Sequence, residues 1–266
     1  KATLLSGSGS IKIENTAADL LLSARTSGAG AEVNVDQSGN LLVASAQAGS
    51  KVTLLAGGAL ADTESALIRG TALKARGTSI GSTSNVLNTQ INGGTVELEA
   101  TDGGIYFNNV GDITGAGLSA SASGDVNISN TGNVAFGTLL SGGNMVLALS
   151  GDGTDANGDT VNFDVSGADG LRYAAKSMGT DADKLELKVA KLIVDTSSGG
   201  IYAINDNTSA FSLVRAVAAG AGSDISIETK GDLNLGVSES RGNKISLNSG
   251  GRIEDARVVG ETAPNA

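Results

Sequence analysis

The sequence predicts an all-β fold, a parallel β-helix in which the chain winds as a solenoid of roughly 19 to 24 residues per coil. Short apolar alternations recur at that interval, and glycine-rich corners separate them. Glycine supplies 39 of the 266 residues and aromatic residues only 3%, while 40% of the chain is hydrophobic. This composition favours tight corners around a thin core of small aliphatic side chains.

The strands are predicted from alternation at period two. In the first part of the chain the alternating apolar pairs are Ile11/Ile13, Val33/Val35 and Val52/Leu54. In the next part they are Ile105/Phe107, Val126/Ile128 and Met145/Leu147. A second pair often follows about eight residues later, as Val134/Phe136 and Leu233/Leu235 do. The corners between them read Ser-Gly-Asn, Thr-Gly-Asn and Lys-Gly-Asp, residues that favour tight turns.

One segment, 181–194, has features of a helix, since it opens with acidic residues and ends its charges in lysine. However, Leu185, Leu187 and Val189 alternate, so we predict strands there. Strands this short bury too little surface to stand alone as a hairpin. Stacking coil upon coil instead pairs each strand on both edges and closes a continuous core.

Longer repeats order the coils into cassettes. The stretch that begins at Val33 recurs at Val126 and again at Ile225, offsets of 93 and 99 residues. Leu73 and Gly81 likewise correspond to Leu171 and Gly179. We therefore expect 1–266 to form a single elongated β-helix fragment of about three cassettes: 1–70 partial, 71–168 complete and 169–266 truncated. Because both ends fall inside a repeat, we expect an excerpt of a longer array whose ends associate with one another.

Charge and composition narrow the function. The net charge is −10 with no basic cluster, which argues against nucleic acid as a partner. Cysteine and histidine are both missing, which removes thiolate sites and the commonest general base and zinc ligand. The longest apolar runs fall far short of a membrane span, so we expect no membrane insertion of this segment.

These units resemble the repeat regions of filamentous-haemagglutinin-type and leukotoxin-like filamentous adhesins of Gram-negative bacteria. The resemblance rests on Gly-Asp/Asn-apolar-x-apolar units, Thr-Gly-Asn turns and the closing stretch from Leu247 to Asp255, and it covers essentially the whole chain. It implies a right-handed parallel β-helix that serves as a stalk in a very large protein, secreted and displayed on the bacterial cell surface. The secretion domain and a dedicated receptor-binding domain are not recognisable in this sequence.

One segment suggests a metal site. Within 151–160, oxygen-bearing side chains gather as calcium prefers, at Asp152, Asp155, Asn157 and Asp159. The segment is not an EF-hand, because the sixth loop position counted from Asp155 is Thr160 rather than glycine. Calcium is the only cofactor that the sequence suggests, and a plain polar loop is the alternative that we favour.

Catalysis has weaker support. Parallel β-helices include polysaccharide lyases and hydrolases, and carboxylates such as Asp102, Asp112, Asp125 and Asp152 are the candidates to line such a face. Acidic residues at corners are ordinary turn formers, and Asp125 has a counterpart at Asp224. We therefore predict no enzyme activity.

The aromatic residues are also weighed. Tyr106, Phe107, Tyr202 and Phe211 lie near one recurring position, and we expect them to fill the core or a corner rather than to form a sugar-stacking patch.

The predicted role is a structural stalk or spacer with weak lateral contacts to a host or neighbouring-cell glycan or protein. A carbohydrate-active β-helix enzyme and a calcium-binding repeat module are the alternatives.

Overall fold

The computed structural model describes residues 1–242 and 244–256. It confirms the predicted fold class: in the part of the chain that it describes, the structure is all β, with parallel strands in stacked coils and no helix. The chain forms two compact units, 1–132 and 133–266. Each unit is a β-solenoid with two sheets.

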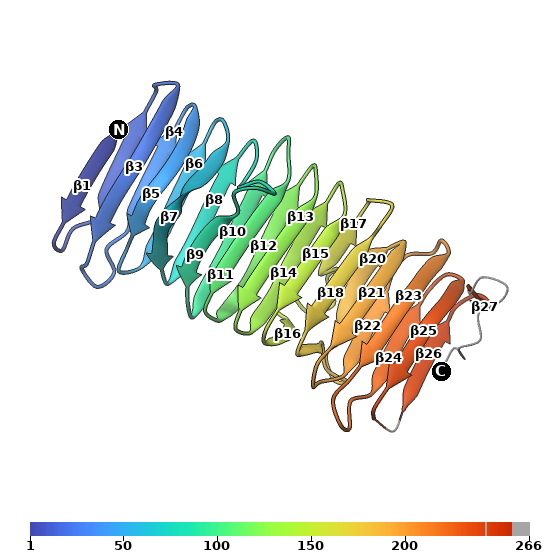
Figure 1. Ribbon diagram of the computed structural model, residues 1–266. Helices are drawn as coiled ribbons and strands as arrows, with labels where there is room; N and C mark the ends of the chain where they lie inside the picture. The colour runs from blue at the N-terminus through green and yellow to red at the C-terminus, as the bar shows by residue number, and fades with distance from the viewer. Residues whose placement is uncertain (243, 257–266) are drawn as a thin grey trace. The chain divides into compact units, whose positions relative to one another are not determined.

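Unit 1 alternates strictly between its two sheets, so that each coil contributes one strand to each (Figure 1). The first sheet contains β1 (Ala2–Ser6), β3 (Asp19–Thr26), β5 (Asn40–Gln47), β7 (Leu60–Gly70), β9 (Leu87–Ile91), β11 (Ile105–Val110) and β13 (Val126–Thr131). The second contains β2 (Ile11–Asn15), β4 (Val33–Gln37), β6 (Lys51–Ala56), β8 (Ala72–Gly77), β10 (Gly94–Ala100) and β12 (Ile113–Ala122).

Register stacks like on like in the core of unit 1. Val33 pairs with Val52, and Val52 pairs with Leu73; all three are buried. Paired residues in this unit lie 19 (Val33 to Val52) to 23 (Leu73 to Val96) positions apart, within the predicted coil length. Each coil therefore buries its alternating aliphatic residues against those of the next coil.

The two copies of the cassette motif in unit 1 lie in opposite sheets. Four successive pairings lead from Val33 to Leu118 along the second sheet, a distance of 118 − 33 = 85 residues. The offset of 93 residues thus carries the equivalent of Val33 half a coil further, to Val126 in β13 of the first sheet. A cassette is therefore about four and a half coils, and successive copies turn their motif to opposite faces.

Buried polar side chains also stack inside the coils. Asn109 is fully buried; its Oδ1 accepts from the Ile91 N–H at 2.7 Å and its Nδ2 donates to the Ile91 carbonyl at 3.0 Å. Asn205 makes the same pair of bonds to Val189 in unit 2, both at 3.1 Å. The asparagine amide satisfies backbone groups at a corner where sheet pairing stops.

Unit 2 has the same plan with an interrupted second sheet. Its first sheet contains β15 (Met145–Leu149), β18 (Leu171–Ala175), β21 (Lys191–Thr196), β23 (Phe211–Ala218), β25 (Leu233–Ser240) and β27 (Ile253–Asp255). The other strands are β14 (Val134–Ser141), β16 (Asp152–Asp155), β17 (Phe163–Val165), β19 (Ser177–Met178), β20 (Leu185–Val189), β22 (Ile201–Asn205), β24 (Ile225–Thr229) and β26 (Ile245–Ser249).

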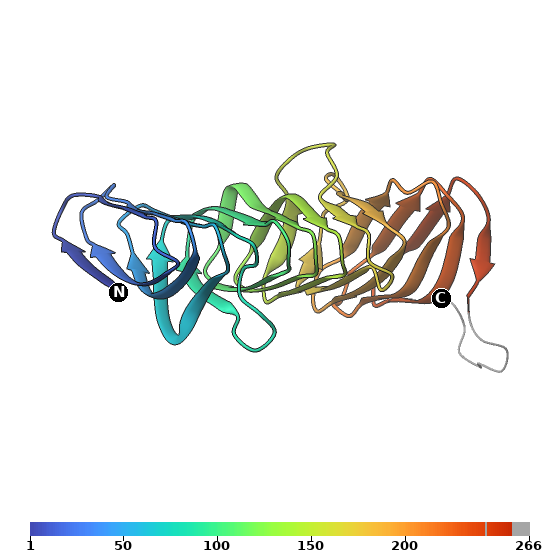
Figure 2. The ribbon, with the colours of Figure 1, turned by 90° about the horizontal axis from the view of Figure 1, so that it is seen from above.

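The interruption comes from two short excursions of the chain. β14 pairs with β16 through its first residues and with β17 through its last, so that a loop leaves the stack between β16 and β17. This loop projects as the yellow-green segment at the top of Figure 2. The next coil is split in the same way between β19 and β20. The excursions stretch the pairing interval to 18 (Leu187 to Asn205) up to 26 (Met145 to Leu171) residues, slightly beyond the predicted range.

Three aromatic rings fill the core of unit 2 beside this interruption. Phe136 and Phe163 meet edge to face with centroids 4.8 Å apart, and Tyr173 lies 6.2 Å from each. A Cβ atom at Gly153 would lie 1.8 Å from the Tyr173 hydroxyl oxygen, so the tyrosine occupies the volume that a side chain at residue 153 would need. Gly153 is thus required by the packing of Tyr173.

Other sequence predictions can be compared with the structure. The segment 181–194 forms β20 and most of β21, as predicted, and no helix. Phe107 and Phe211 are buried in the core, whereas Tyr106 and Tyr202 are half-buried. The correspondence of Gly81 and Gly179 is confirmed, because both have a φ near +60° and both lie against a tyrosine carbonyl, that of Tyr106 or Tyr202.

Candidate functional site

The four predicted calcium ligands do not meet at one point. Asp152 begins β16 and Asp155 ends it, and the two side chains join separate polar clusters. Asn157 lies with Asp155, while Asp159 is exposed in the loop that follows. In the described residues no group of three or more acidic, histidine or cysteine side chains is arranged to hold a metal ion.

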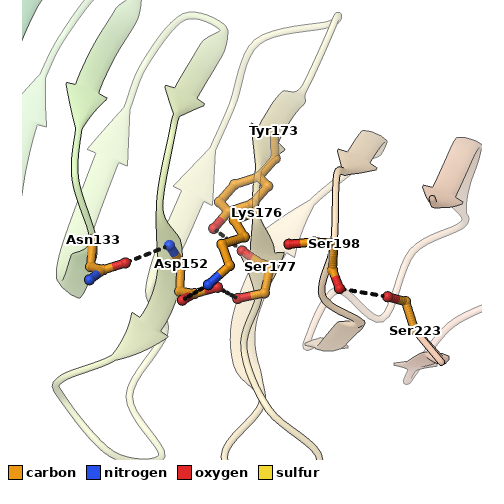
Figure 3. Close-up of polar contacts among 7 residues, drawn as sticks. All are labelled: Asn133, Asp152, Tyr173, Lys176, Ser177, Ser198 and Ser223. Atoms are coloured by element: carbon orange, nitrogen blue, oxygen red, sulfur yellow. Dashed lines mark hydrogen bonds and ion pairs between the residues drawn. The ribbon is translucent and has the colours of Figure 1, made fainter. Parts of the chain in front are cut away.

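The first cluster surrounds Asp152 (Figure 3). Its Oδ2 lies 3.0 Å from the Lys176 Nζ, and its Oδ1 accepts a hydrogen bond from the Ser177 hydroxyl at 2.8 Å. The backbone N–H of Asp152 donates to the Asn133 Oδ1 at 2.9 Å. The pairing of β16 with β19 sets Asp152 directly beside Ser177, one coil away. Three consecutive coils are therefore connected through this one carboxylate.

The protonation states in this cluster follow from burial and charge. Burial acts to raise the pKa of Asp152, but the hydrogen bonds from Lys176 and Ser177 outweigh it and the net pKa is lowered. Burial, with a smaller contribution from the Asp152 charge, raises the pKa of Tyr173, whose hydroxyl donates to the Ser177 carbonyl at 3.0 Å. Asp152 is therefore ionised and Tyr173 neutral at physiological pH.

This arrangement is suited to bracing a corner rather than to nucleophilic catalysis. A serine nucleophile needs a base that accepts its proton, and a carboxylate with a lowered pKa is a poor base. The lysine ammonium is held by the same carboxylate, so it offers no lone pair. Asp152 and Lys176 replace Ala59 and Thr78 of the previous cassette, whereas Ser177 corresponds to Ser79.

The second cluster surrounds the side-chain amide of Asn162, which is fully buried. Its Nδ2 lies 2.7 Å from the Asp155 Oδ1, 2.9 Å from the Asn157 Oδ1, and 3.2 and 3.3 Å from the carbonyls of Phe136 and Gly137. Four oxygens thus converge on one nitrogen that has two hydrogens to give. The amide occupies the position that a cation would need in order to bind Asp155 and Asn157 together.

Glu186 forms the far side of this cluster. Its backbone N–H donates to the Asn162 Oδ1 at 2.9 Å, and its Oε2 is shut off from solvent without a hydrogen-bond partner among the described residues. Burial, followed by the charges of Asp155, Asp183 and Asp159, raises the pKa of Glu186 to about 7. A carboxyl group here thus exchanges its proton near neutral pH.

The same position in unit 1 holds a related pair. Asp62 corresponds to Asp155 at an offset of 93 residues, and Asn88 corresponds to Glu186 at an offset of 98. The buried Asp62 accepts from the Asn88 backbone N–H at 2.8 Å, and burial raises its pKa. Where the first copy pairs a carboxylate with an amide, the second pairs two carboxylates, which explains the raised pKa of Glu186.

Sequence reasoning missed Asn162, Lys176, Ser177 and Glu186. A signal was present for Glu186 and Lys176, since both depart from the residue at the equivalent position of the repeat, Asn88 and Thr78. The other carboxylates considered for catalysis are dispersed: Asp102 and Asp125 are exposed and Asp112 is half-buried, all in unit 1.

Replacing Glu186 by glutamine should flatten the pH dependence of stability. Because the folded-state pKa lies above the ordinary value of 4.5, the stabilising contribution is complete below about pH 4.5 and is lost as pH rises through 7. We expect the parent to lose about 1–2 kcal/mol of unfolding free energy between pH 5 and 8 at this partly solvated site, and E186Q to lose less. Urea unfolding at both pH values measures the difference.

The exposed Glu64 provides the control for this experiment. The substitution Glu64→Gln should leave the pH dependence of the parent unchanged. If E186Q and the parent lose the same free energy between pH 5 and 8, the buried Oε2 of Glu186 does not govern stability in this range.

Calcium should bind weakly at most, because Asn162 already occupies the centre between Asp155 and Asn157. Titration of calcium into chelator-treated protein, followed by calorimetry, should give little heat. Tight binding that is abolished by Asp155→Ala together with Asp159→Ala would show instead that the loop rearranges to form the predicted calcium site.

Comparison with family models, with curated proteins and with solved structures finds no match for this chain. Among the residues that the structure describes, no helix has the length and apolar character to cross a membrane.

Proposed function

We propose that the chain is a structural stalk or spacer segment of a very large bacterial protein that is secreted and displayed at the cell surface as an adhesin. Its lateral surface makes weak contacts with a glycan or protein of a host or neighbouring cell. The observation that carries this proposal is the repetitive stacking of coils, in which inward side chains serve packing in coil after coil.

Stacked parallel coils are suited to such a role. Each coil adds about 4.8 Å along the axis of its unit and is held to both neighbours by continuous backbone hydrogen bonds. The cores consist of aliphatic residues in register, as at Val33, Val52 and Leu73. Extending such a stack requires only further copies of one repeat, which supports a spacer more directly than it supports an enzyme.

The polar clusters support the same interpretation. Asp152 connects three coils, and Asn109 and Asn205 satisfy backbone groups at corners. These side chains are used up in holding the solenoid together. The alternative of a carbohydrate-active enzyme needs two convergent carboxylates in an open groove, and Asp155 and Glu186 converge instead around a buried amide.

Surface display can be tested on the cells that produce the protein. Antibodies raised against this chain should label intact cells as strongly as permeabilised ones, and brief protease treatment of intact cells should remove the label. Labelling that appears only after permeabilisation would overturn the proposal of a surface-displayed segment.

A further inference from the structure

The outer face of the first sheet of unit 1 differs in charge from the rest of the molecule. Unit 1 has seven Lys and Arg residues against eleven Asp and Glu, a net charge of 7 − 11 = −4. The strands of this sheet contain three acidic residues. Asp19 lies at the first position of β3, Asp62 is buried, and Glu64 lies in the part of β7 skipped by the register shift against β5. The remaining charged side chains of these strands are Arg25 and Arg69.

Register places both arginines in one row across the sheet. Consecutive pairings connect, in order, Leu5, Arg25, Gln47, Arg69 and Gln90. Their chain neighbours Ala24, Ala46, Ile68 and Thr89 are buried, so the row itself points outward. Figure 1 shows the strands that carry this row, β1, β3, β5, β7 and β9, side by side.

The row alternates arginine with glutamine. The two arginines are separated by one intervening strand, about 9.5 Å at the usual strand spacing. Gln47 between them is held by a hydrogen bond from its Nε2 to the Ser45 hydroxyl at 3.0 Å. The adjacent outward row is formed by uncharged side chains, Thr3, Ser23, Ser45 and Leu67.

The opposite sheet of unit 1 shows that this pattern is specific to one face. There, cations and carboxylates lie together: Lys74 pairs with Glu97 at 2.6 Å, and Arg76 lies 3.3 Å from Glu99. Arg25 and Arg69 are exposed, and the described residues provide no ion pair for either. Two guanidinium groups in a row of amides and hydroxyls are therefore left with their donors toward solvent.

A groove continues the row at its Arg69 end. It has a volume of about 610 Å³ and is lined by Ala48, Arg69, Gly70, Thr71, Gln90, Asn92, Val110 and Gly111. Val110 is 49% exposed, so the groove offers an apolar surface beside amide and guanidinium donors. This combination suits a sugar ring, which presents both hydroxyl groups and an apolar face.

We propose that this face binds a linear carboxylated polysaccharide lying across the strands, with carboxylates of the polymer on Arg25 and Arg69. In an extended two-fold polymer of β-1,4-linked uronates, successive sugars turn to opposite sides. Carboxylates on one side therefore recur at every second sugar, which matches arginines at every second strand. The guanidinium fork binds carboxylates through two parallel hydrogen bonds, and the intervening amides bind hydroxyl groups.

This inference deepens the proposed function, because a surface-displayed segment would encounter such polymers outside the cell. It is tested on the purified chain, so that a failure to bind leaves the labelling of intact cells unaffected as a separate result. The probe is a fluorescent β-1,4-linked oligoglucuronate. The cello-oligosaccharide of equal length is its control, since it differs only in lacking the carboxylates.

Binding is measured by fluorescence anisotropy at fixed salt. The oligoglucuronate should bind and the neutral oligomer should not. The double variant Arg25→Gln/Arg69→Gln should weaken binding by at least about tenfold, because a hydrogen bond to a charged group contributes about 1.5–3 kcal/mol. Glutamine already alternates in this row, so the variant should fold. Arg25→Lys/Arg69→Lys should weaken binding to an intermediate degree, because lysine keeps the charge but loses the fork.

The matched control is Arg172→Gln/Arg241→Gln, which removes two other exposed arginines and changes the net charge equally. It should alter affinity by less than about twofold, the scale of screened long-range charge effects. Equal losses in both double variants would mean non-specific attraction and would overturn the proposal. Undiminished binding by the folded Arg25→Gln/Arg69→Gln variant, or tighter binding of a poly-glutamate peptide than of the oligoglucuronate, would also overturn it.

Discussion

Replacing Tyr173 by alanine should destabilise unit 2 by about 3–5 kcal/mol, the usual cost of removing a large buried aromatic side chain. The ring is 1% exposed, packs against Phe136 and Phe163, and donates its hydroxyl hydrogen bond to the Ser177 carbonyl. Urea unfolding followed by circular dichroism measures the loss. Tyr173→Phe, which keeps the ring, should cost only about 1 kcal/mol for the missing hydrogen bond.

The sharper form of this prediction uses the previous cassette as a template. There, Leu60 and Ala75 occupy the places of Gly153 and Tyr173, and both are buried. Gly153→Leu alone should be severely destabilising, because its Cβ would meet the Tyr173 hydroxyl at 1.8 Å. Combined with Tyr173→Ala, it restores the leucine and alanine pair and should recover at least about 2–3 kcal/mol of the summed losses. Additive losses in the double variant would show that the two cassettes do not pack equivalently.

Replacing Asn109 by alanine should destabilise unit 1 by about 3–4 kcal/mol. The substitution leaves both the N–H and the carbonyl of Ile91 without their partner in a buried corner, and each unsatisfied group costs about 1–3 kcal/mol. It also removes the hydrogen bonds to Thr89 and Asn130, both 2.8 Å long.

The neighbouring residue provides the control for Asn109. Asn108 points to the other side of β11, where its Nδ2 makes a single 3.2 Å bond to Asn88. Asn108→Ala should therefore cost less than about 1 kcal/mol in the same urea experiment. Similar losses for Asn108→Ala and Asn109→Ala would contradict a special role for the buried amide.

Much of the fold is predictable because the chain repeats one local pattern. Alternation at Ile11/Ile13 or Val126/Ile128 identifies strands without knowledge of their partners, and the spacing between such pairs sets the coil length. The half-coil offset between cassettes was not predicted. It depends on the summed lengths of four coils, each of which varies by a few residues.

The candidate site was predictable only in part. The segment 151–160 was recognised as unusual, and it does lie beside an excursion from the stack. The partners of its carboxylates come from the next coil, 24 residues away for Lys176 and 31 for Glu186. Which side chains meet across coils is set by register, and a single residue inserted in a loop would change it. Local sequence patterns do not contain this information.

The central claim, that the stacked coils serve as a spacer that resists tension, is tested most directly by single-molecule pulling on the chain held at its two ends. We predict that extension proceeds in discrete releases at a resisting force. Each release should correspond to one coil or a small group of coils, and a coil of about 20 residues adds about 70 Å of extended chain. Smooth extension at negligible force, with no discrete releases, would contradict a load-bearing role.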